Sequence, residues 1–399
     1  MDISIVLSDR LSERASHIQP AQTLAIAARA KQMKKEGIDV VSFSTGEPDF
    51  DTPEPISEVG VEAIRSGFTH YTDAKGTPEL RKAVANKFVR ENGLPSTPST
   101  VLVSSGGKHS LFNTMMAILN PGDEVIIPAP YWVSYPEMVR LLGGVPVILE
   151  TSAEERYKIT IDQLLAAITP NTKALIINSP SNPTGSMYTP DQLREIGKLV
   201  ADVGFYVISD ELYEKIIHVD INHFSIGSMP ELATLAITVN GVSKAWAMTG
   251  WRIGFMTGPE DVVKAASAIQ SQTTSNPCSI SQKAALEAIF NSADEATRLR
   301  EAFTKRREFM GSLLADIPDI KYPAPDGAFY YFIDASSYRT DRTPDSIALA
   351  EYLLVEHHVA VVPGVAFGDD RGFRISYACS DDDIRKGVER IAQGLANLR

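Results

Sequence analysis

The chain has 399 residues, of which 44% are hydrophobic and 22% charged, and its formal net charge is −12. This composition is typical of a globular protein of about two or three domains, and the negative charge argues against nucleic acid or an anionic membrane surface as the main partner. Only two cysteines occur, Cys278 and Cys379, without the CxxC spacing of a zinc site. Because no secretory signal or bilayer-spanning apolar stretch is evident, we expect a cytoplasmic protein with no bound metal.

A helix is predicted near residues 23–36, packed against the C-terminal part of the chain. Between about residues 100 and 290, short apolar runs alternate with helical patterns such as 109–119 and 190–203. The runs that read as strands are 101–104, 124–128, 173–178, 205–209, 235–239 and 252–257. Thr189 precedes Pro190 as a helix N-cap. This alternation predicts an α/β fold whose mostly parallel sheet has helices on both faces.

The last third of the chain differs from this pattern. A long charged helix at 294–317 leads to strands at 328–333, 359–362 and 372–377, with a helix at 344–358 capped by Thr343. This order of elements predicts a smaller α+β domain. We therefore divide the chain into a large domain, 48–290, and a small domain made of 1–47 and 291–399.

Lys244 lies between two of the predicted buried strands. Burial lowers the pKa of a lysine and leaves more of it as a nucleophilic amine. Arg252, eight positions later, could bind an anion close to that amine. An amine beside a phosphate-binding cation is what a pyridoxal phosphate Schiff base requires. The alternative, a surface lysine on a loop, is commoner for any single lysine.

Polar residues follow several other predicted strands, at the sheet edge where open parallel sheets bind ligands. Gly107 and Lys108 open a helix whose N–H groups could bind a phosphate, although an ordinary tight turn is equally compatible. Trp132 could stack on a flat ring or pack in the core. Asn182 precedes Pro183 in a strong turn signal that would orient its amide.

Asp210 ends a buried strand, where a carboxylate needs a partner such as a protonated pyridine nitrogen; a helix-capping role is the alternative. Tyr213, three residues on, offers a phenol. Arg374 lies in a short alternating strand, opposite in face to Phe373 and Ile375. Its guanidinium suits a carboxylate, with a surface salt bridge as the alternative.

As a set these motifs resemble the class I pyridoxal-phosphate aminotransferases of fold type I, the aspartate aminotransferase family. The pattern is most similar to a bacterial branch that includes aspartate/prephenate aminotransferases. The matching segments are 46–53, 106–108, 130–137, 182–185, 210–213, 243–244, 248–254 and 373–378. The resemblance implies a seven-stranded sheet, the cofactor pyridoxal 5'-phosphate, amino-acid and 2-oxo-acid substrates, and a homodimer with shared active sites.

The resemblance also implies roles for individual residues. Lys244 would form the Schiff base and then transfer the substrate proton. Asp210 would hold the pyridinium proton, Tyr213 and Asn182 would bond the ring oxygen, and Trp132 would stack on the ring. The residues at phosphate-binding positions are Gly107, Lys108, Ser243, Arg252 and, from the neighbouring subunit, Tyr71. The residues at substrate-binding positions are Gly46, Trp132, Asn182 and Arg374.

The chain departs from the family pattern at a few places. Gly241 stands where better-known relatives have a phosphate-binding serine. Gln19 and Ala21 replace a lysine and a serine that are often found near the entrance of the site. The arginine that other branches use for a second carboxylate has no visible counterpart. The resemblance to this branch implies that the lysine of the Gly-Gly-Lys turn, here Lys108, binds that carboxylate.

We therefore expect a transaminase that moves the amino group of L-aspartate or L-glutamate to 2-oxoglutarate or oxaloacetate by a ping-pong mechanism. One alternative keeps the fold and cofactor but prefers aromatic or prephenate-type substrates. A more distant alternative is a non-catalytic ligand-binding regulator built on the same fold.

Overall fold

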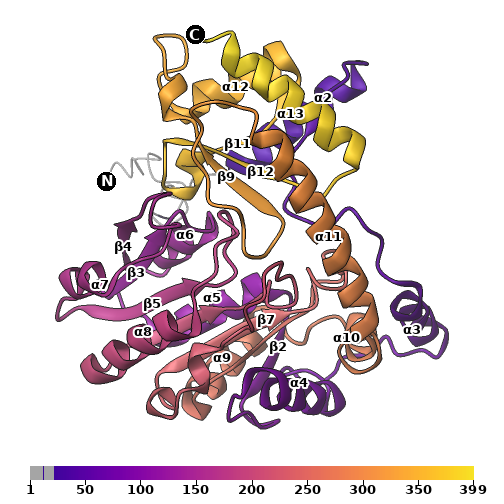
Figure 1. Cartoon of the computed structure of the whole chain (residues 1–399). Helices are drawn as coiled ribbons and strands as arrows, with labels where there is room; N and C mark the ends of the chain where they lie inside the picture. The colour runs from indigo at the N-terminus through magenta and orange to yellow at the C-terminus, as the bar shows by residue number, and fades with distance from the viewer. Residues whose placement is uncertain (1–11, 13–21) are drawn as a thin grey trace, which may run out of the picture.

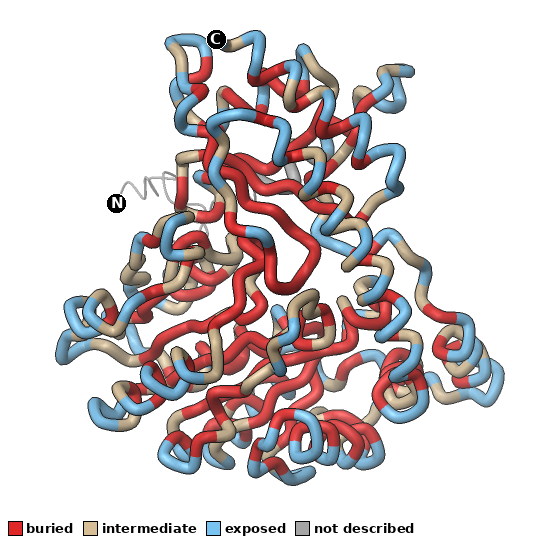
Figure 2. The backbone as a smooth tube through the Cα atoms, viewed as in Figure 1, coloured by how far each residue is buried: buried red, intermediate tan, exposed pale blue. Residues whose placement is uncertain are grey.

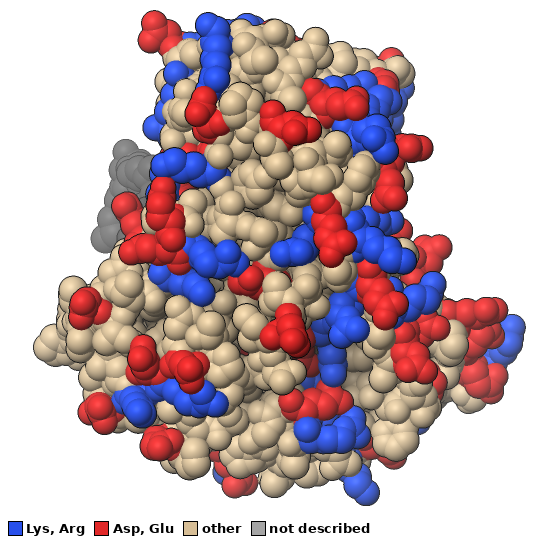
Figure 3. All heavy atoms as spheres, in the orientation of Figure 1, with Lys and Arg blue, Asp and Glu red and all other residues tan. Residues whose placement is uncertain are grey.

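The computed structural model describes residue 12 and residues 22–399 (Figure 1). Gln19 and Ala21, which the sequence singled out, lie outside the described residues. In the described part, no helix has the length and apolar character needed to cross a bilayer. Acidic and basic side chains are interspersed over the face drawn in Figure 3.

Seven strands form the larger sheet, in the order β2-β8-β7-β6-β5-β3-β4. Their bounds are β2 Val101–Ser104, β3 Glu124–Ala129, β4 Val145–Glu150, β5 Thr172–Asn178, β6 Tyr206–Asp210, β7 Ala236–Gly241 and β8 Gly254–Thr257. Only β8 runs antiparallel to its neighbours β2 and β7. The expected mostly parallel, seven-stranded sheet is confirmed.

Strand β4 was missing from the runs picked out in the sequence. It pairs only with β3 at the edge of the sheet, and both of its end residues are exposed. Residues 145–149 form an apolar run, but Pro146 within the run disfavours a strand in the interior of a sheet. An edge position tolerates this proline, because one side of the strand needs no hydrogen-bond partner.

Helices cover both faces of this sheet, as expected. On β5, Ala174 and Ile176 pack with helices α5 (Gly107–Ile118), α6 (Ser134–Leu141) and α9 (Glu260–Thr273). Leu175 and Ile177, on the opposite face, pack with α7 (Ile161–Ala167) and α8 (Pro190–Val203). A third cluster joins β2 and β8 to α3 (Glu54–Arg65), α4 (Pro78–Asn92) and α10 (Ser279–Asn291). Figure 2 shows the buried strands between these helices.

Helix α8 begins where its sequence predicts. The Thr189 hydroxyl accepts from the Gln192 N–H at 3.2 Å, and the Gln192 side chain accepts from the Thr189 N–H at 3.0 Å. This reciprocal capping satisfies two backbone donors that the helix leaves free.

A second, three-stranded antiparallel sheet has the order β11-β12-β9. Its strands are β9 Tyr330–Asp334, β11 Val362–Pro363 and β12 Gly372–Ser376, and a short parallel pair joins β1 Val41–Ser42 to β10 Val359–Ala360. The surrounding helices are α2 Gln22–Lys35, α11 Ala293–Leu314, α12 Ser346–His357 and α13 Asp381–Ala396. Ala30 of α2 packs with Leu354 and Ala360, so the predicted contact between the N-terminal helix and the C-terminal part is confirmed. Figure 1 shows α11 extending from the large sheet to this part.

Three local predictions were wrong. The single strand predicted at 359–362 is divided between β10, which pairs with β1, and β11, which pairs with β12. Asp345, not Thr343, caps α12, because its carboxylate accepts from the Ala348 N–H at 2.8 Å while Thr343 is buried before the helix. Arg252 is not part of a strand: its φ is 56°, and β8 begins only at Gly254. This left-handed turn lets the Arg252 side chain leave the sheet and reach the cavity described below.

A buried ionic cluster joins α4 to the segment that follows β6. Lys87, only 3% exposed, forms an ion pair with Glu214 and donates to the Asn92 Oδ1 at 2.8 Å. Burial raises the pKa of Glu214, but the charges of Lys87 and His223 oppose this and lower it to about 2. Glu211, Glu214 and His223 bring three possible metal-ligand atoms within 4.8 Å of one another. Because Lys87 and Asn92 already contact these carboxylates, we interpret the cluster as structural.

Lys87→Met should therefore lower the free energy of unfolding by about 3–5 kcal/mol, because it leaves a buried carboxylate without its cation. Lys82→Met, at an exposed position of the same helix, should change it by less than about 0.5 kcal/mol. Urea titrations of both variants at neutral pH measure the difference. Equal stabilities would show that the Lys87 ion pair contributes nothing to the fold.

Candidate functional site

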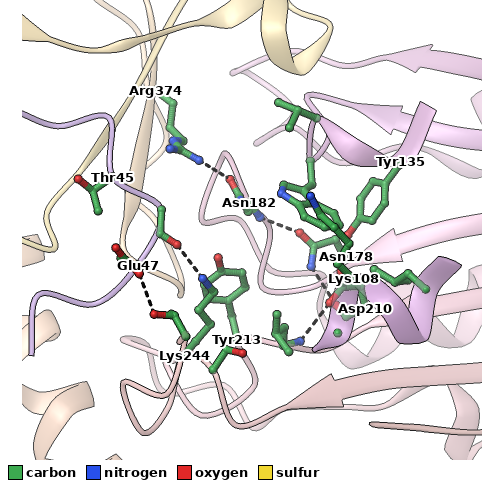
Figure 4. A pocket seen from close by; sticks show the side chains of 18 of the residues that line it. Thr45, Glu47, Lys108, Tyr135, Asn178, Asn182, Asp210, Tyr213, Lys244 and Arg374 are labelled. Carbon is green, nitrogen blue, oxygen red and sulfur yellow. Dashed lines mark hydrogen bonds between the residues drawn. The ribbon is translucent and has the colours of Figure 1, made fainter. Parts of the chain in front are cut away.

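A cavity of about 520 Å³ lies at the carboxyl ends of the parallel strands, between the large sheet and β12 (Figure 4). Its size is within the range of cofactor and small-molecule sites. The residues predicted from the sequence that line it are Gly46, Gly107, Lys108, Trp132, Asn182, Asp210, Tyr213, Ser243, Lys244, Arg252 and Arg374. Tyr71 alone does not, and its side chain is 90% exposed.

Lys244 lies on the turn that follows β7, and its Nζ donates to the backbone carbonyl of Gly46 at 2.7 Å. Burial lowers the pKa of Lys244 to about 8; Glu47 opposes this shift, and Arg374 adds to it. A substantial fraction of this amine is therefore neutral near physiological pH, as a nucleophile or proton acceptor requires.

Asp210 ends β6 and is 5% exposed. Burial raises its pKa to about 6, against hydrogen bonds from the Tyr135 hydroxyl, at 2.6 Å, and the Leu212 N–H, at 3.3 Å. No helix begins directly after Asp210, but its carboxylate does cap the following turn through the Leu212 N–H, so capping explains one of its two hydrogen bonds. The carboxylate is held at the cavity by a buried phenol and has oxygen lone pairs left for a cationic partner.

Arg374 projects from β12 and is 3% exposed. Its Nη1 donates to the Asn182 Oδ1 at 2.9 Å and its Nη2 to the Ser44 carbonyl at 3.0 Å. The Tyr330 and Phe367 rings flank the guanidinium, with centroids 4.4 and 5.0 Å from Cζ. The surface salt-bridge alternative is therefore wrong, since this buried cation contacts only neutral groups among the described residues and remains available to an anion.

The turn before α5 is built by glycines in close contact. Gly106 has φ +94°, and a Cβ there would lie 2.4 Å from the Arg252 Nη2. A Cβ on Gly254 would lie 2.2 Å from the Gly107 nitrogen. The helix begins at Gly107, so its first N–H groups and the exposed Arg252 side chain lie at one end of the cavity, where an anion would be stabilised.

Lys108 and Trp132 form one wall of the cavity. The Lys108 Nζ lies 4.9 Å from the Trp132 ring centroid, a cation–π contact. Partial burial and the nearby Arg252 lower the pKa of Lys108. Trp132 packs edge-on against Tyr135, with centroids 5.3 Å apart, but it also lines the cavity, so it is not simply a core residue. Tyr213 shares a hydrogen bond with Tyr330 at 2.9 Å between the hydroxyl oxygens.

Several cavity residues were not singled out in the sequence: Ser44, Glu47, Tyr135, Asn178, Thr249 and Phe367. Asn178 could have been found, because it ends β5 as Asp210 ends β6. Glu47 follows Gly46 directly, and its carboxylate accepts from the Thr249 hydroxyl at 2.7 Å. Phe367 comes from a segment far along the chain, so no local pattern marks it.

Gly241, noted as a departure, has a structural reason. A Cβ at this position would lie 3.1 Å from the Gly254 Cα, the Ile253 carbonyl oxygen and the Leu212 side chain. This spacing is tight, so a serine would require its neighbours to shift.

The lowered pKa of Lys244 can be tested without cofactor. At about pH 8 roughly half of this amine should be neutral, against less than about 1% of an ordinary exposed lysine. Trace acetylation with acetic anhydride, followed across pH by peptide mapping, should show Lys244 reacting with a midpoint near pH 8. Lys82 serves as the exposed reference. If both lysines share one midpoint above pH 10, the amine is not perturbed.

Comparisons with known proteins agree with this geometry. The family model for aminotransferase class I and II matches residues 38–391. An aspartate aminotransferase from a Bacillus species is 45% identical over 96% of this chain and 99% of its own length. An aspartate/prephenate aminotransferase from Cereibacter sphaeroides is 46% identical over 97% and 99%. The solved structure of a Thermus thermophilus aspartate aminotransferase with maleate has a TM-score of 0.92 at 45% identity, covering 96% of this chain and 99% of that one. The chain is therefore an enzyme of the class I and II aminotransferase family.

Proposed function

We propose that this enzyme transfers the amino group of L-aspartate or L-glutamate to 2-oxoglutarate or oxaloacetate by a ping-pong mechanism that uses pyridoxal 5'-phosphate. The observation that carries the proposal is one cavity containing an amine of lowered pKa, Lys244, between a buried carboxylate, Asp210, and a buried guanidinium, Arg374. The names of the relatives support the choice of aspartate. Membership of an aminotransferase family removes the alternative of a non-catalytic regulator.

The residues of the cavity fit this cofactor. Asp210 is a buried carboxylate whose hydrogen-bond donors are both neutral. A buried charge is costly unless a partner of opposite charge completes it. The glycines of the turn before α5 let Arg252 approach the start of the helix, because a Cβ on Gly106 would lie 2.4 Å from the Arg252 Nη2. The backbone N–H groups of the helix and this cation are thus placed together for a phosphate.

Different parts of the cavity would hold different parts of the cofactor. We assign the phosphate to Gly107, Lys108, Ser243 and Arg252, and to Tyr71 of the partner subunit in a homodimer. The high exposure of Tyr71 in the single chain is compatible with a role across a subunit interface. We assign the ring to Asp210 at its nitrogen, Tyr213 and Asn182 at its oxygen, and Trp132 at its face. When bound, the cofactor supplies an electron sink for the α-carbon of the amino acid.

The protein supplies binding, orientation and proton transfer. Arg374 binds the α-carboxylate of the amino acid, close to the backbone of Gly46 and to Asn182. Lys244, with a pKa of about 8, would accept the proton from the α-carbon and donate it to the C4′ position of the cofactor. Asp210 stays ionised next to a ring cation, because an opposite charge lowers the pKa that burial raises.

Substrate preference is decided by few groups. Lys108 reaches over Trp132 and is our candidate for binding the second carboxylate of aspartate. Preference for aromatic or prephenate-type substrates is the second candidate, favoured by the aspartate/prephenate name of one relative and by the Trp132 and Phe367 rings in the cavity. Discrimination between dicarboxylate and aromatic substrates depends on a few contacts, each worth about 1–3 kcal/mol.

We also keep two sequence-based assignments as proposals. The division into 48–290 and 1–47 with 291–399 is supported by the two separate sheets and by the β1–β10 pairing. A cytoplasmic, reducing location is supported by Cys278 and Cys379, which are both free thiols.

Transamination can be tested directly. Purified protein supplied with pyridoxal 5'-phosphate should convert aspartate and 2-oxoglutarate, with a higher kcat/KM for aspartate than for phenylalanine. Borohydride reduction should leave the adduct on Lys244, and Lys244→Ala should lower kcat by about 100-fold to 10 000-fold through loss of the proton acceptor. Activity of that variant within tenfold of wild type, or an adduct on another lysine, contradicts the assignment. A preference for phenylalanine supports the second candidate.

Arg374→Lys should lower kcat/KM by about 10-fold to 100-fold, equally for aspartate and phenylalanine, because both substrates lose the same bidentate partner. Arg339→Lys, in an ion pair away from the cavity, is the matched control and should leave kinetics unchanged. If kcat/KM falls for aspartate but not for phenylalanine, Arg374 binds the second carboxylate of aspartate and not the α-carboxylate.

A further inference from the structure

Asn178 is the last residue of β5 and lies directly opposite Asp210, the last residue of β6, in the parallel register. Both polar atoms of its side-chain amide form hydrogen bonds. The Nδ2 donates to the backbone carbonyl of Asp210 at 2.9 Å, and the Oδ1 accepts from the backbone N–H of Asn182 at 2.7 Å. One side chain therefore connects the end of β6 to the loop that carries Asn182.

The connection continues across the cavity (Figure 4). The Asn182 Oδ1 accepts from the Arg374 Nη1 at 2.9 Å, and on the other side Asp210 accepts from the Tyr135 hydroxyl at 2.6 Å. Because Arg374 can only donate, the oxygen of the Asn182 amide must face it. The Nδ2 of Asn182 is then the end of the amide that remains for a ligand.

The backbone alone does not hold these two strand ends together well. The last ladder bond, from the Ser179 N–H to the Asp210 carbonyl, is long at 3.3 Å, and the next residue, Pro180, has no N–H to donate. The Asn178 amide supplies the shorter bond to the same carbonyl. A side chain that only donates or only accepts could not serve both Asp210 and Asn182.

We propose that Asn178 is a positioning residue that couples the anchor of the cofactor ring, Asp210, to the substrate anchor formed by Asn182 and Arg374. This inference rests on the proposed function. It implies that loss of the Asn178 amide weakens cofactor binding and substrate binding together, through two different hydrogen bonds, although Asn178 itself carries neither charge nor reactive atom.

The test uses Asn178→Ala and the milder Asn178→Ser, whose hydroxyl is too short to reach both partners. Pyridoxal 5'-phosphate is titrated into cofactor-free protein, and maleate, a dicarboxylate without an amino group, into the loaded protein. We expect each dissociation constant to rise by about threefold to tenfold, the effect of one neutral hydrogen bond. Both are equilibrium measurements that do not depend on turnover.

A double-mutant cycle separates positioning from general destabilisation. In an Asn182→Ala background, Asn178→Ala should no longer weaken maleate binding, because the Asn182 side chain that connects Asn178 to Arg374 is absent. The same substitution should still weaken cofactor binding, because the hydrogen bond from Asn178 to Asp210 is lost in either background. Asn113→Ala is the control: this buried amide donates to the Gln270 side chain at 3.0 Å and does not line the cavity. Asn113→Ala should lower the unfolding temperature but leave the dissociation constants of pyridoxal 5'-phosphate and of maleate within twofold of the wild-type values.

The proposal is overturned if Asn178→Ala or Asn178→Ser leaves both constants unchanged, or if the effect on maleate binding is the same with and without Asn182. It is also overturned if Asn113→Ala weakens binding as much, because destabilisation would then explain the loss. Failure of the proposed function is a separate result, since wild-type protein would then not bind pyridoxal 5'-phosphate at all.

Discussion

The site depends on a carboxylate held at the buried end of a central strand. Asp210 is surrounded by the apolar interior on one side and the cavity on the other, and its burial raises its pKa to about 6. The Tyr135 hydroxyl offsets part of that cost. A carboxylate in this environment favours a cation beside it, so this part of the cavity suits a positively charged group of a ligand.

Parallel strands explain why so many functional groups meet at one place. Strands β3, β5, β6 and β7 point the same way, so the residues after each strand converge at a single edge of the sheet. The antiparallel β8 begins at that edge, and Arg252 precedes it in a left-handed turn. Close glycine contacts between α5 and β8 bring the helix N-terminus and this cation to the same end of the cavity.

The two sides of the cavity come from segments far apart in the chain. The large sheet supplies Lys244 and Asp210, whereas Arg374 lies on β12 and is held by the Ser44 carbonyl and Asn182. Glu214, which pairs with Lys87 of α4, directly follows Tyr213 in the segment after β6. Stability and the cavity are therefore linked in this segment, because buried charges and the cavity-lining side chains of Asp210 and Tyr213 share one short stretch of backbone.

Much of this organisation was predictable from local patterns. The apolar runs, the Thr189–Pro190 cap and the residues at strand ends are determined by neighbours in the sequence, so the fold class and the positions of Lys244, Asp210 and Asn182 followed from them. The family resemblance added their expected roles. Strand β4, the Asp345 cap and the left-handed turn at Arg252 were missed or misplaced. Pro146 lies within the apolar run of β4 and disfavours a strand, and the geometry of caps and turns is weakly encoded in composition.

The sequence by itself determined which residue types stand at the ends of buried strands, since hydrophobic periodicity and turn residues act over a few positions. Only the tertiary structure decided which of them touch. The Tyr135–Asp210 bond, the Asn178 bridge and the Tyr330 and Phe367 rings around Arg374 join residues from different strands and sheets. Contacts at such separations depend on the packing of whole layers, and no local pattern specifies them.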